Sequence, residues 1–307
     1  MNESNTDTNE NREATPLSPK KPTTNFEKLY QEYTKSVSYL FIIVVLASFI
    51  TLTTVTITEK LIDSENHRRF WINQSVKYLS IFFIQLICGL CVKYRSFKVN
   101  YSRKIVHISY FVIPQLLDTI ILYFHKTIYT ELWNITIIYC LLLSLLEVIR
   151  KRFSLFKIMY AAIDRPEDRP FTTFWFVTQL SVSLPIIMGF SILFSSLDQN
   201  NFIFVPLWIL AFGDGLAEPV GTKYGHHKYK VKGFLVKKEY TRSLEGSSCV
   251  YLASIISVLA YYNSFTKASI TFCLIIMPFA MTFVEAYSPH TWDNPIILLT
   301  GYIIMKK

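Results

Sequence analysis

Residues 38–58 read SYLFIIVVLASFITLTTVTIT, a stretch of 21 residues without a charged side chain. An α-helix needs about 20 apolar residues to cross the hydrocarbon core of a bilayer. This stretch is therefore long enough to form a transmembrane helix. Further runs of mostly uncharged residues follow along the chain at 78–92, 105–124, 132–149, 172–197, 202–220, 248–262 and 268–287.

The composition of the whole chain supports the same fold class. Of its 307 residues, 51% are hydrophobic and 17% are charged, and the mean hydropathy is +0.31. Soluble domains carry about 25% charged residues, which keep their surfaces hydrated. A soluble α/β enzyme, a secreted disulfide scaffold and a nucleic-acid-binding protein are excluded. We predict an all-α, polytopic transmembrane helical bundle of about 8–9 spans, in which residues 295–305 are too short to assign as a span.

The net charge of +9 follows the order of the loops. If successive runs cross the membrane in alternate directions, 23 of the 31 Lys and Arg residues lie on the side of the N-terminus. Cytoplasmic loops of membrane proteins carry an excess of this kind. We therefore expect a cytoplasmic N-terminus, and we attribute the basic excess to topology rather than to a nucleic-acid partner.

The N-terminal segment has a different composition. Residues 1–37 are rich in Asn, Thr, Glu and Pro, with few bulky apolar residues before Phe26. Such a segment buries too little apolar surface to fold alone, so we expect a disordered cytoplasmic tail. The rest of the chain is divided into two N-terminal spans over residues 38–94 and a membrane-embedded core over residues 95–307.

Glycine is concentrated in one short window of the chain. Six of the nine glycines lie within residues 213–246. Clustered glycines indicate backbone close to a ligand, or turns that other residues cannot make. The window is not a dinucleotide-binding fingerprint, because GxGxxG would require glycine at Glu218, and the chain has no Walker A sequence.

Two carboxylates within this window indicate a site for a divalent cation. Asp214 and Glu218 are four residues apart, so on a helix they lie on the same face. An unpaired carboxylate at the end of an apolar span is costly, which makes both residues functional candidates. Mg²⁺ prefers one or two carboxylates together with substrate phosphates. The alternative is that both residues cap a helix while the neighbouring lysines only follow topology.

Cations and a helix start follow the two carboxylates. Lys223, Lys228 and Arg242 lie downstream, and phosphoryl transfer requires such cations for the developing charge. Ser243-Leu-Glu-Gly-Ser-Ser248 then opens the next apolar run. The backbone N–H groups at a helix N-terminus form a ready anion site.

Other loops on the same predicted face carry polar groups. Arg103 and His107 are four residues apart at the start of one run, and Glu147 and Arg150 at the end of another form an expected ion pair. The segment Glu285–Asn294 contains acidic residues, His290 and Asn294 but no Lys or Arg. Topology does not explain such a loop, so we expect it to face a metal ion or the cations after residue 220.

These motifs together resemble those of a known family. The segments Gly213-Asp-Gly-Leu-Ala-Glu-Pro-Val-Gly-Thr-Lys-Tyr-Gly225 and Arg242-Ser-Leu-Glu-Gly-Ser247 look like the signature of the phytol kinase and dolichol kinase family. Arg103–His107 and Glu285 with Asp293-Asn294 resemble two further elements of that family. The family comprises polytopic, CTP-using lipid-alcohol kinases, which are distantly similar to phosphatidate cytidylyltransferases. The resemblance covers roughly residues 100–300.

The resemblance implies roles for individual residues. Asp214 and Glu218 would hold the divalent metal and act in catalysis, with His107, Glu218 and Asp293 as candidates for the general base. Glu218 stands where many members have Asp, and Arg242 where many have Lys, which changes the geometry of phosphate binding. The residues expected to bind the nucleotide are Gly213, Gly215, Gly221, Lys223, Gly225, Arg242, Ser243, Glu245, Gly246 and Asn294.

The activity implied by the resemblance is a kinase reaction at a membrane surface. The γ-phosphate of CTP would pass to a long-chain isoprenoid alcohol such as phytol, farnesol or dolichol, giving the monophosphate and CDP. Mg²⁺ or another divalent cation would assist. The nucleotide would arrive from the cytoplasm and the alcohol from the bilayer of the endoplasmic reticulum or plasma membrane. The organelle, the natural alcohol and the oligomeric state stay open.

Two alternatives remain at the level of sequence. One is a related lipid enzyme, either a phosphatidate cytidylyltransferase or a CTP-dependent diacylglycerol kinase, which would share the metal and nucleotide groups. The other is a non-enzymatic transporter whose carboxylates pair with cations. A transporter is expected to show repeats and interrupted helices near the middle of the membrane. Here the polar residues cluster at one predicted face, which favours an enzyme.

Overall fold

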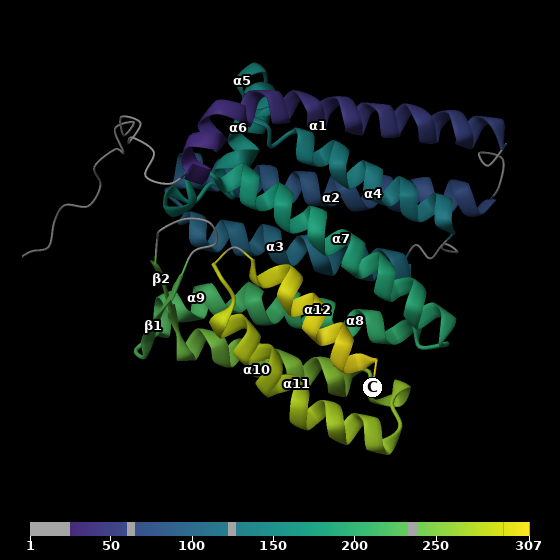
Figure 1. Cartoon of the computed structure of the whole chain (residues 1–307), viewed down its shortest axis with the longest axis vertical. Coiled ribbons are helices and arrows are strands. Elements are labelled where there is room, and N and C mark those ends of the chain that lie inside the picture. Colours follow the sequence, from purple (N-terminus) through teal and green to yellow (C-terminus); the bar gives the residue numbers. More distant parts are fainter. Residues whose placement is uncertain (1–24, 60–64, 122–126, 233–238, 291, 307) are drawn as a thin grey trace, which may run out of the picture.

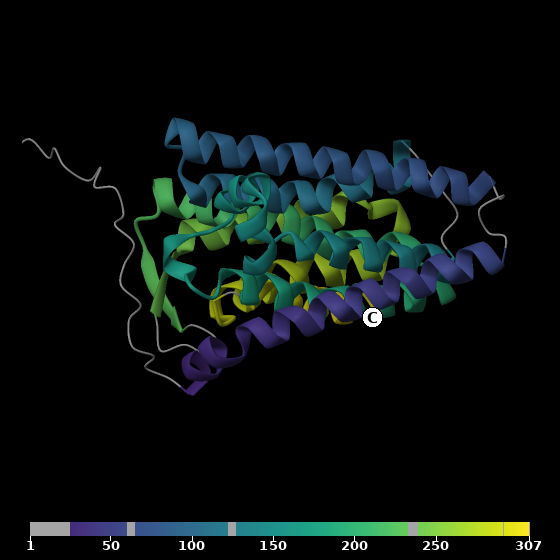
Figure 2. The ribbon, with the colours of Figure 1, turned by 90° about the horizontal axis from the view of Figure 1, so that it is seen from above.

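The computed structural model describes residues 25–59, 65–121, 127–232, 239–290 and 292–306. The longer helices run roughly parallel or antiparallel to one another, and a small β-hairpin lies at one end of the bundle (Figures 1 and 2). The helices of the first half are α1 (Asn25–Thr58), α2 (Glu65–Arg95), α3 (Val99–Leu116), η2 (Leu117–Ile121), α4 (Ile128–Leu143), α5 (Glu147–Arg152), α6 (Ser154–Ala161) and η3 (Pro166–Asp168).

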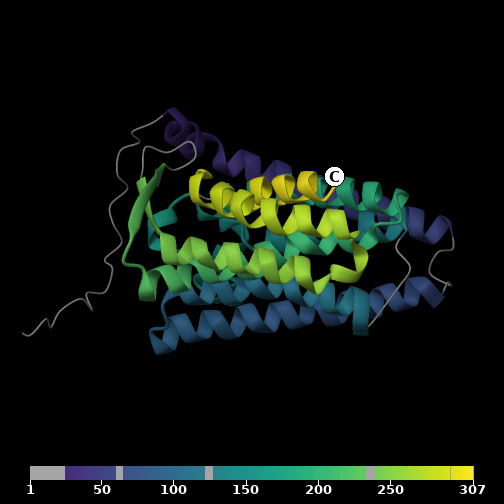
Figure 3. The same cartoon turned by 90° about the horizontal axis from the view of Figure 1, so that it is seen from below.

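The second half continues the bundle and adds the hairpin. Helices α9 to α12 lie side by side with the hairpin at their end (Figure 3). The elements are α7 (Thr172–Ser196), η4 (Asn200–Ile203), α8 (Phe204–Trp208), η5 (Ile209–Asp214), α9 (Gly215–Tyr224), β1 (Lys228–Lys232), β2 (Glu239–Ser243), α10 (Leu244–Ala260), η6 (Tyr262–Ser264), α11 (Lys267–Tyr287) and α12 (Asp293–Met305).

Five helical segments of the described residues are long and apolar enough to cross a membrane. They confirm the prediction of a helical, integral multi-pass membrane protein, while the count of 8–9 spans and the side of the N-terminus stay predictions. The five segments are Glu32–Thr58, Glu65–Arg95, Thr172–Ser196, Asn200–Tyr224 and Lys267–Tyr287, and three shorter apolar helices are Ile128–Leu143, Leu244–Ala260 and Asp293–Met305.

A short β-hairpin is added to the predicted helical bundle. Strands β1 and β2 pair antiparallel, with Lys228 opposite Ser243 and Lys232 opposite Glu239. Side chains alternate across a strand, and here the cross-strand pair Val231 and Tyr240 is buried while the lysines face outward. The basic loop expected from the charge pattern is therefore partly an ordered ribbon.

The first helix begins earlier than the composition predicted. Helix α1 starts at Asn25, so residues 25–37 of the expected tail are helical, and residues 1–24 lie outside the described residues. The ring of Phe26 lies 5.3 Å from that of Phe171 and 5.1 Å from that of Phe174, measured between centroids. Aromatic packing against the start of α7 stabilises this first turn.

The segment 200–224 is helical throughout but not uniform. It passes through a 3₁₀ turn, a short α-helix and the π-helical turn η5 before α9 begins at Gly215. A π-helical turn widens the helix locally and is frequent at functional sites. The turn ends at Asp214, and the buried residues Leu210 and Val250 belong to the core that supports it.

Candidate active site

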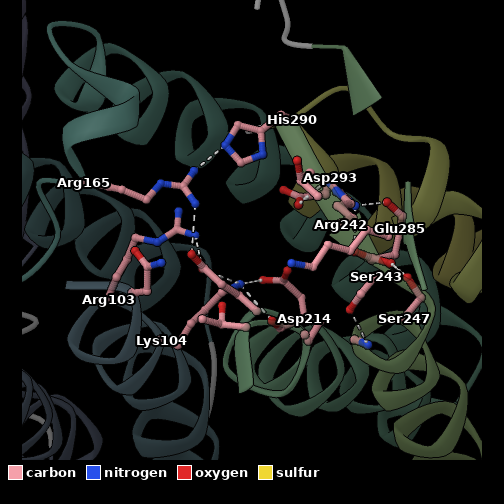
Figure 4. A pocket seen from close by; sticks show the side chains of 18 of the residues that line it. Arg103, Lys104, Arg165, Asp214, Arg242, Ser243, Ser247, Glu285, His290 and Asp293 are labelled. Atoms are coloured by element: carbon pink, nitrogen blue, oxygen red, sulfur yellow. Dashed lines mark hydrogen bonds and ion pairs between the residues drawn. The ribbon is translucent and has the colours of Figure 1, made fainter. Parts of the chain in front are cut away.

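A polar cavity of about 290 Å³ lies at the end of the bundle where the hairpin joins α10. Its side chains come from α3, the loop around η3, η5 and α9, the hairpin, and the facing ends of α11 and α12 (Figure 4). The lining residues are Asn100, Arg103, Lys104, Arg165, Glu167, Asp214, Ala217, Glu218, Gly221, Thr222, Lys228, Thr241, Arg242, Ser243, Gly246, Ser247, Glu285, His290 and Asp293.

Asp214 is held by two residues of α3. Lys104 donates hydrogen bonds to Asp214 Oδ2 at 2.9 Å and to the Asp214 carbonyl oxygen at 2.8 Å. His107 Nε2 lies 3.3 Å from the same Oδ2 and 3.1 Å from the carbonyl oxygen of Leu210. Lys104 and Asp214 are both buried. Removing one partner of such a pair leaves an uncompensated buried charge.

Glu218 lies one turn further along and binds two arginines. Arg103 Nη2 donates to Glu218 Oε2, and Arg165 Nη1 donates to Glu218 Oε1 at 2.9 Å. Lys104 Nζ is 4.0 Å from Glu218 Oε2 as well as 2.9 Å from Asp214. The ammonium group of Lys104 therefore lies between the two carboxylates that the sequence placed on one helical face.

Arg165 connects this pair to the loop after α11. It binds Asp168 through two parallel hydrogen bonds, of 3.0 Å to Oδ2 and 3.1 Å to Oδ1, and its Nη2 contacts His290 Nε2. Burial alone would raise the pKa of Asp168, but His290 and Arg165 together hold it well below its usual value. Burial lowers the pKa of His290. The ring of Tyr240 stacks on His290 with 3.6 Å between centroids, so the hairpin rests on this network.

Arg242 of β2 forms the second centre of charge. It donates to Glu285 Oε1 at 2.6 Å and to the Glu285 carbonyl oxygen through Nη1, and to Asp293 Oδ2 at 3.1 Å through Nη2. Ser247 donates to the other oxygen of Glu285 at 2.7 Å. Burial opposes the charge of Arg242, yet the two carboxylates raise its pKa above the usual value. One guanidinium thus joins the hairpin to the ends of α11 and α12.

The charges around the cavity balance. Five cationic and five acidic side chains line it, and the geometry pairs most of them across different elements. Such an arrangement can exchange partners, because the cations can turn to an anionic ligand and the carboxylates to a cation. The ten residues are Arg103, Lys104, Arg165, Lys228, Arg242, Glu167, Asp214, Glu218, Glu285 and Asp293.

The clustered glycines allow helices to approach closely. A Cβ atom at Gly221 would lie 2.6 Å from Ser243 Oγ, and one at Gly246 would lie 2.6 Å from the carbonyl oxygen of Ala217. Both of these glycines line the cavity. Ser243 caps α10 by accepting a hydrogen bond from Gly246 N at 3.1 Å. The start of α10 is therefore packed directly onto α9, next to the cavity.

The other three predicted glycines lie behind that wall. A Cβ atom at Gly213 would lie 3.0 Å from Val250 Cα, and one at Gly215 would lie 2.7 Å from a side-chain carbon of Ile108. A Cβ atom at Gly225 would lie 2.2 Å from the carbonyl oxygen of Gly221. The structure thus shows close packing at these three glycines, and their part in ligand binding stays a prediction.

Three further predicted residues lie away from the polar cavity. Lys223 is exposed, and its Nζ lies 4.8 Å from the centre of the Tyr224 ring. Glu245 binds His227 Nδ1 at 2.8 Å on the outer side of the hairpin. Asn294 donates to Gln179 at 3.0 Å and lines a neighbouring cavity. Lys223 and Glu245 are thus not brought to the site that their positions in the sequence suggested.

Comparison with curated proteins finds a relative of defined activity. The chain is 31% identical over 114 residues to the phytol kinase of Synechocystis sp., a match that covers 36% of this chain and 46% of that protein. This chain resembles phytol kinase. This match confirms the resemblance drawn from the motifs. The matched part spans about half the length of the relative. No family model and no solved structure matches the chain.

Two residues of the charged network around Glu218 had no clear signal in the sequence. Arg165 and Asp168 lie in the loop Arg165-Pro-Glu-Asp-Arg169, whose cations were assigned to topology alone. The sequence feature that suggested a role was the placement of that loop on the same predicted face of the membrane as the other motifs. Lys104 lies within the Arg103–His107 motif, yet its position between two carboxylates required the packing of α3 on η5 and α9.

The donor atoms of the cavity fit a divalent cation held by two carboxylates. No group of three or more His, Cys, Asp or Glu side chains in the described ranges is arranged to hold a metal ion. A Mg²⁺ ion needs only one or two carboxylates when phosphate oxygens and water complete its shell. Asp214 and Glu218 already share the ammonium group of Lys104, so the space between them accepts a positive charge.

Proposed function

We propose that this protein is a membrane-bound lipid-alcohol kinase that transfers the γ-phosphate of CTP to a long-chain isoprenoid alcohol. The observation that carries the proposal is the cavity of balanced, exchangeable charges at one end of an apolar helical bundle. The similarity to a phytol kinase supports the same reaction class. A polar site bordering a membrane is where a water-soluble nucleotide and a lipid alcohol can meet.

The cations of the cavity are placed to bind the phosphates of the nucleotide. Arg103, Arg165 and Arg242 supply planar guanidinium groups, which bind phosphate oxygens in pairs. The N-terminus of α10, with Gly246 in its first turn, adds the positive end of the helix dipole. Because the three arginines are held by carboxylates from other elements, they are positioned before the nucleotide arrives.

Asp214 and Glu218 are the proposed ligands of Mg²⁺. When bound, the ion would supply positive charge against the phosphate oxygens and so stabilise the transferring group. Lys104 lies between the two carboxylates and is placed to pair with a phosphate oxygen instead. The two carboxylates therefore have a cationic partner both with and without the nucleotide.

The reaction requires the hydroxyl oxygen of the alcohol to attack the γ-phosphorus while its proton leaves to a base. The O–P bond to the γ-phosphate of CTP breaks, and CDP leaves. Of the three candidate bases, Asp293 lines both the polar cavity and the smaller cavity next to it. His107 lines only the smaller cavity, and Glu218 only the polar one. We therefore assign the proton acceptor to Asp293, where the two substrates would meet.

The proposed topology places this site at the cytoplasmic face. The three shorter apolar helices and α3 would cross together with the five long segments, giving the 8–9 spans expected from the sequence. Residues 95–307 would form the catalytic core, and the helices of residues 38–94 would pack beside it. The membrane would be of the endoplasmic reticulum or plasma membrane type, with nucleotide entering from the cytoplasm and alcohol from the bilayer.

The proposal is tested on purified protein in detergent with Mg²⁺ and labelled CTP. With γ-labelled CTP and phytol, label is expected in an organic-soluble monophosphate, and ATP and GTP serve as competing donors. Asp214→Asn is expected to abolish transfer, whereas Lys223→Gln, an exposed site outside the cavity, is expected to retain it. Absence of transfer to any alcohol would refute the kinase. Incorporation of α-labelled CTP into phosphatidate would identify a cytidylyltransferase instead.

A further inference from the structure

A second cavity, of about 210 Å³, lies inside the bundle between α2, α3, α4 and α7. Its wall is mainly apolar and includes Phe111, Leu180 and Ile187. Cavities lined by apolar side chains with a few polar groups are typical of small-molecule sites. Apart from Asn294, the residues expected to bind the nucleotide or the metal do not line this cavity.

A small cavity of about 110 Å³ lies next to both the apolar cavity and the polar one. It shares Lys104, Asp214 and Asp293 with the polar cavity. It shares Phe111 and Asn294 with the apolar cavity. The three cavities therefore lie one after another from the charged site into the interior of the bundle, and we call this series of cavities the path.

The path changes from polar to apolar at one pair of residues. Asn294 donates to Gln179 at 3.0 Å, and both side chains line the small cavity and the apolar cavity. Asn294 directly follows Asp293, which lines the polar cavity. A hydroxyl group near this pair would find both donors and a carboxylate, while a hydrocarbon chain attached to it would continue into the apolar space.

The apolar cavity has a measurable length and a charged end. Along α7 its lining runs from Gln179 to Ser191, and twelve residues at 1.5 Å per residue give about 18 Å. Near Ser191 its wall includes the ion pair of Lys77 Nζ and Asp118 Oδ1, at 2.7 Å, and both Asp118 and Ser191 also line a neighbouring cavity. Lys77 is only 1% exposed, so the pair is a fixed part of the wall. Hydrocarbon cannot displace a buried ion pair without leaving its charges uncompensated.

We propose that this path binds the hydrocarbon chain of the acceptor alcohol and measures its length. The hydroxyl lies at Asp293 and Asn294, and the chain tip lies at the ion pair of Lys77 and Asp118. An extended chain advances about 1.25 Å per carbon from a C–C bond of about 1.5 Å, so about 18 Å holds about 14 main-chain carbons. Acceptors of the farnesol and phytol class match this length, whereas dolichols far exceed it. The inference rests on the proposed kinase function.

Two variants on α7 test whether the path selects alcohols by the length of their hydrocarbon chain. Ile187 lines the apolar cavity about 12 Å beyond Gln179, and Ile192 is 58% exposed on the same helix. Ile187→Trp is expected to block long chains but to leave room for geraniol, whose main chain is about 10 Å long by the same spacing per carbon. The ratio of kcat/KM for phytol to that for geraniol should fall about tenfold or more. Ile192→Trp should leave the ratio unchanged.

The wild-type protein should show a matching dependence of activity on the chain length of the alcohol. Phosphorylation should be efficient for farnesol and phytol and weak for a long dolichol. Equal use of all chain lengths, together with an unchanged ratio in Ile187→Trp, would overturn the inference while leaving the kinase proposal intact.

A binding measurement separates the two proposals. A phytol analogue with a photoreactive diazirine at its chain tip should label peptides from α2, α3 or α7 around the ion pair, and excess phytol should compete. Labelling without any phosphoryl transfer would refute the kinase and retain the lipid path. Labelling only of the outer, bilayer-facing helix surfaces would overturn the path, even if Ile187→Trp failed to fold.

Discussion

Replacement of Lys104 by methionine tests whether the pairing around Asp214 holds the site together. The substitution keeps most of the aliphatic stem and removes the ammonium group, so packing changes little. The ammonium group makes two hydrogen bonds, to the carboxylate and to the carbonyl oxygen of Asp214, and lies 4.0 Å from Glu218. His107 is the other side chain that contacts the carboxylate of Asp214 among the described ion pairs.

The expected loss of stability follows from burial. Breaking a buried ion pair by removing one partner costs about 3–5 kcal/mol, because the remaining charge is uncompensated. Asp214 keeps a contact with His107, so we expect the lower end, about 3 kcal/mol. The double variant Lys104→Met with Asp214→Asn removes the stranded charge and should recover about 1–2 kcal/mol relative to Lys104→Met alone.

The assay is unfolding in mixed detergent micelles, followed by tryptophan fluorescence. Lys98→Met, at an exposed position just before α3, is the matched control and should change stability by less than about 0.5 kcal/mol. If Lys104→Met were as stable as Lys98→Met, or if the double variant were the least stable of all, the buried pair would not support the site. Kinase activity should be lost in both Lys104→Met and the double variant.

Further predictions concern the base, the loop network, acid stability and the metal. Asp293→Asn should lower kcat about a hundredfold while a fluorescent CTP analogue still binds, and retention of kcat would exclude Asp293 as the base. Arg165→Gln should destabilise the protein and abolish activity, whereas Arg169→Gln, at an exposed ion pair of the same loop, should do neither. Burial lowers the pKa of His290 from 6.5, so the neutral form is favoured on folding. The stabilisation that the neutral His290 gives to the folded state is therefore complete above pH 6.5 and declines as the pH falls below that value. His290→Gln should flatten the slope of the free energy of unfolding against pH. An unchanged slope would show that His290 does not cause the pH dependence. Chelation of divalent cations should stop transfer, and added Mg²⁺ should restore it.

Much of the fold class was accessible from the sequence because membrane helices follow a simple physical rule. Every backbone polar group in the bilayer must be paired within its own segment, so long uncharged runs can only be helices. Runs such as 38–58 and 172–197 therefore predicted helices that the structure contains. The β-hairpin was missed because its alternation is short and its lysines fitted the charge pattern of a cytoplasmic loop.

The site was accessible only in part. The chemistry of charged residues at the end of an apolar run predicted roles for Asp214, Glu218 and Arg242, and the structure places all three in the wall of the polar cavity. Of the clustered glycines, Gly221 and Gly246 line the polar cavity, whereas Gly213 and Gly215 pack closely against other helices. Lys223 and Glu245 were expected at the site because they are close to it in sequence, but they lie away from the cavity. The side of a helix or hairpin on which a residue lies depends on packing.

The sequence by itself determined that this is a helical membrane protein with a polar site at the ends of its helices, because local hydrophobicity and residue type are enough for both. Only the tertiary structure decided which charges meet. Lys104 lies between Asp214 and Glu218, and Arg165 joins Glu218 to Asp168, across separations of 53 residues or more to Glu218. Such pairings depend on how separate helices pack against one another. The same packing leaves the apolar cavity between α2, α3, α4 and α7. This cavity could not be predicted from any local pattern of residues.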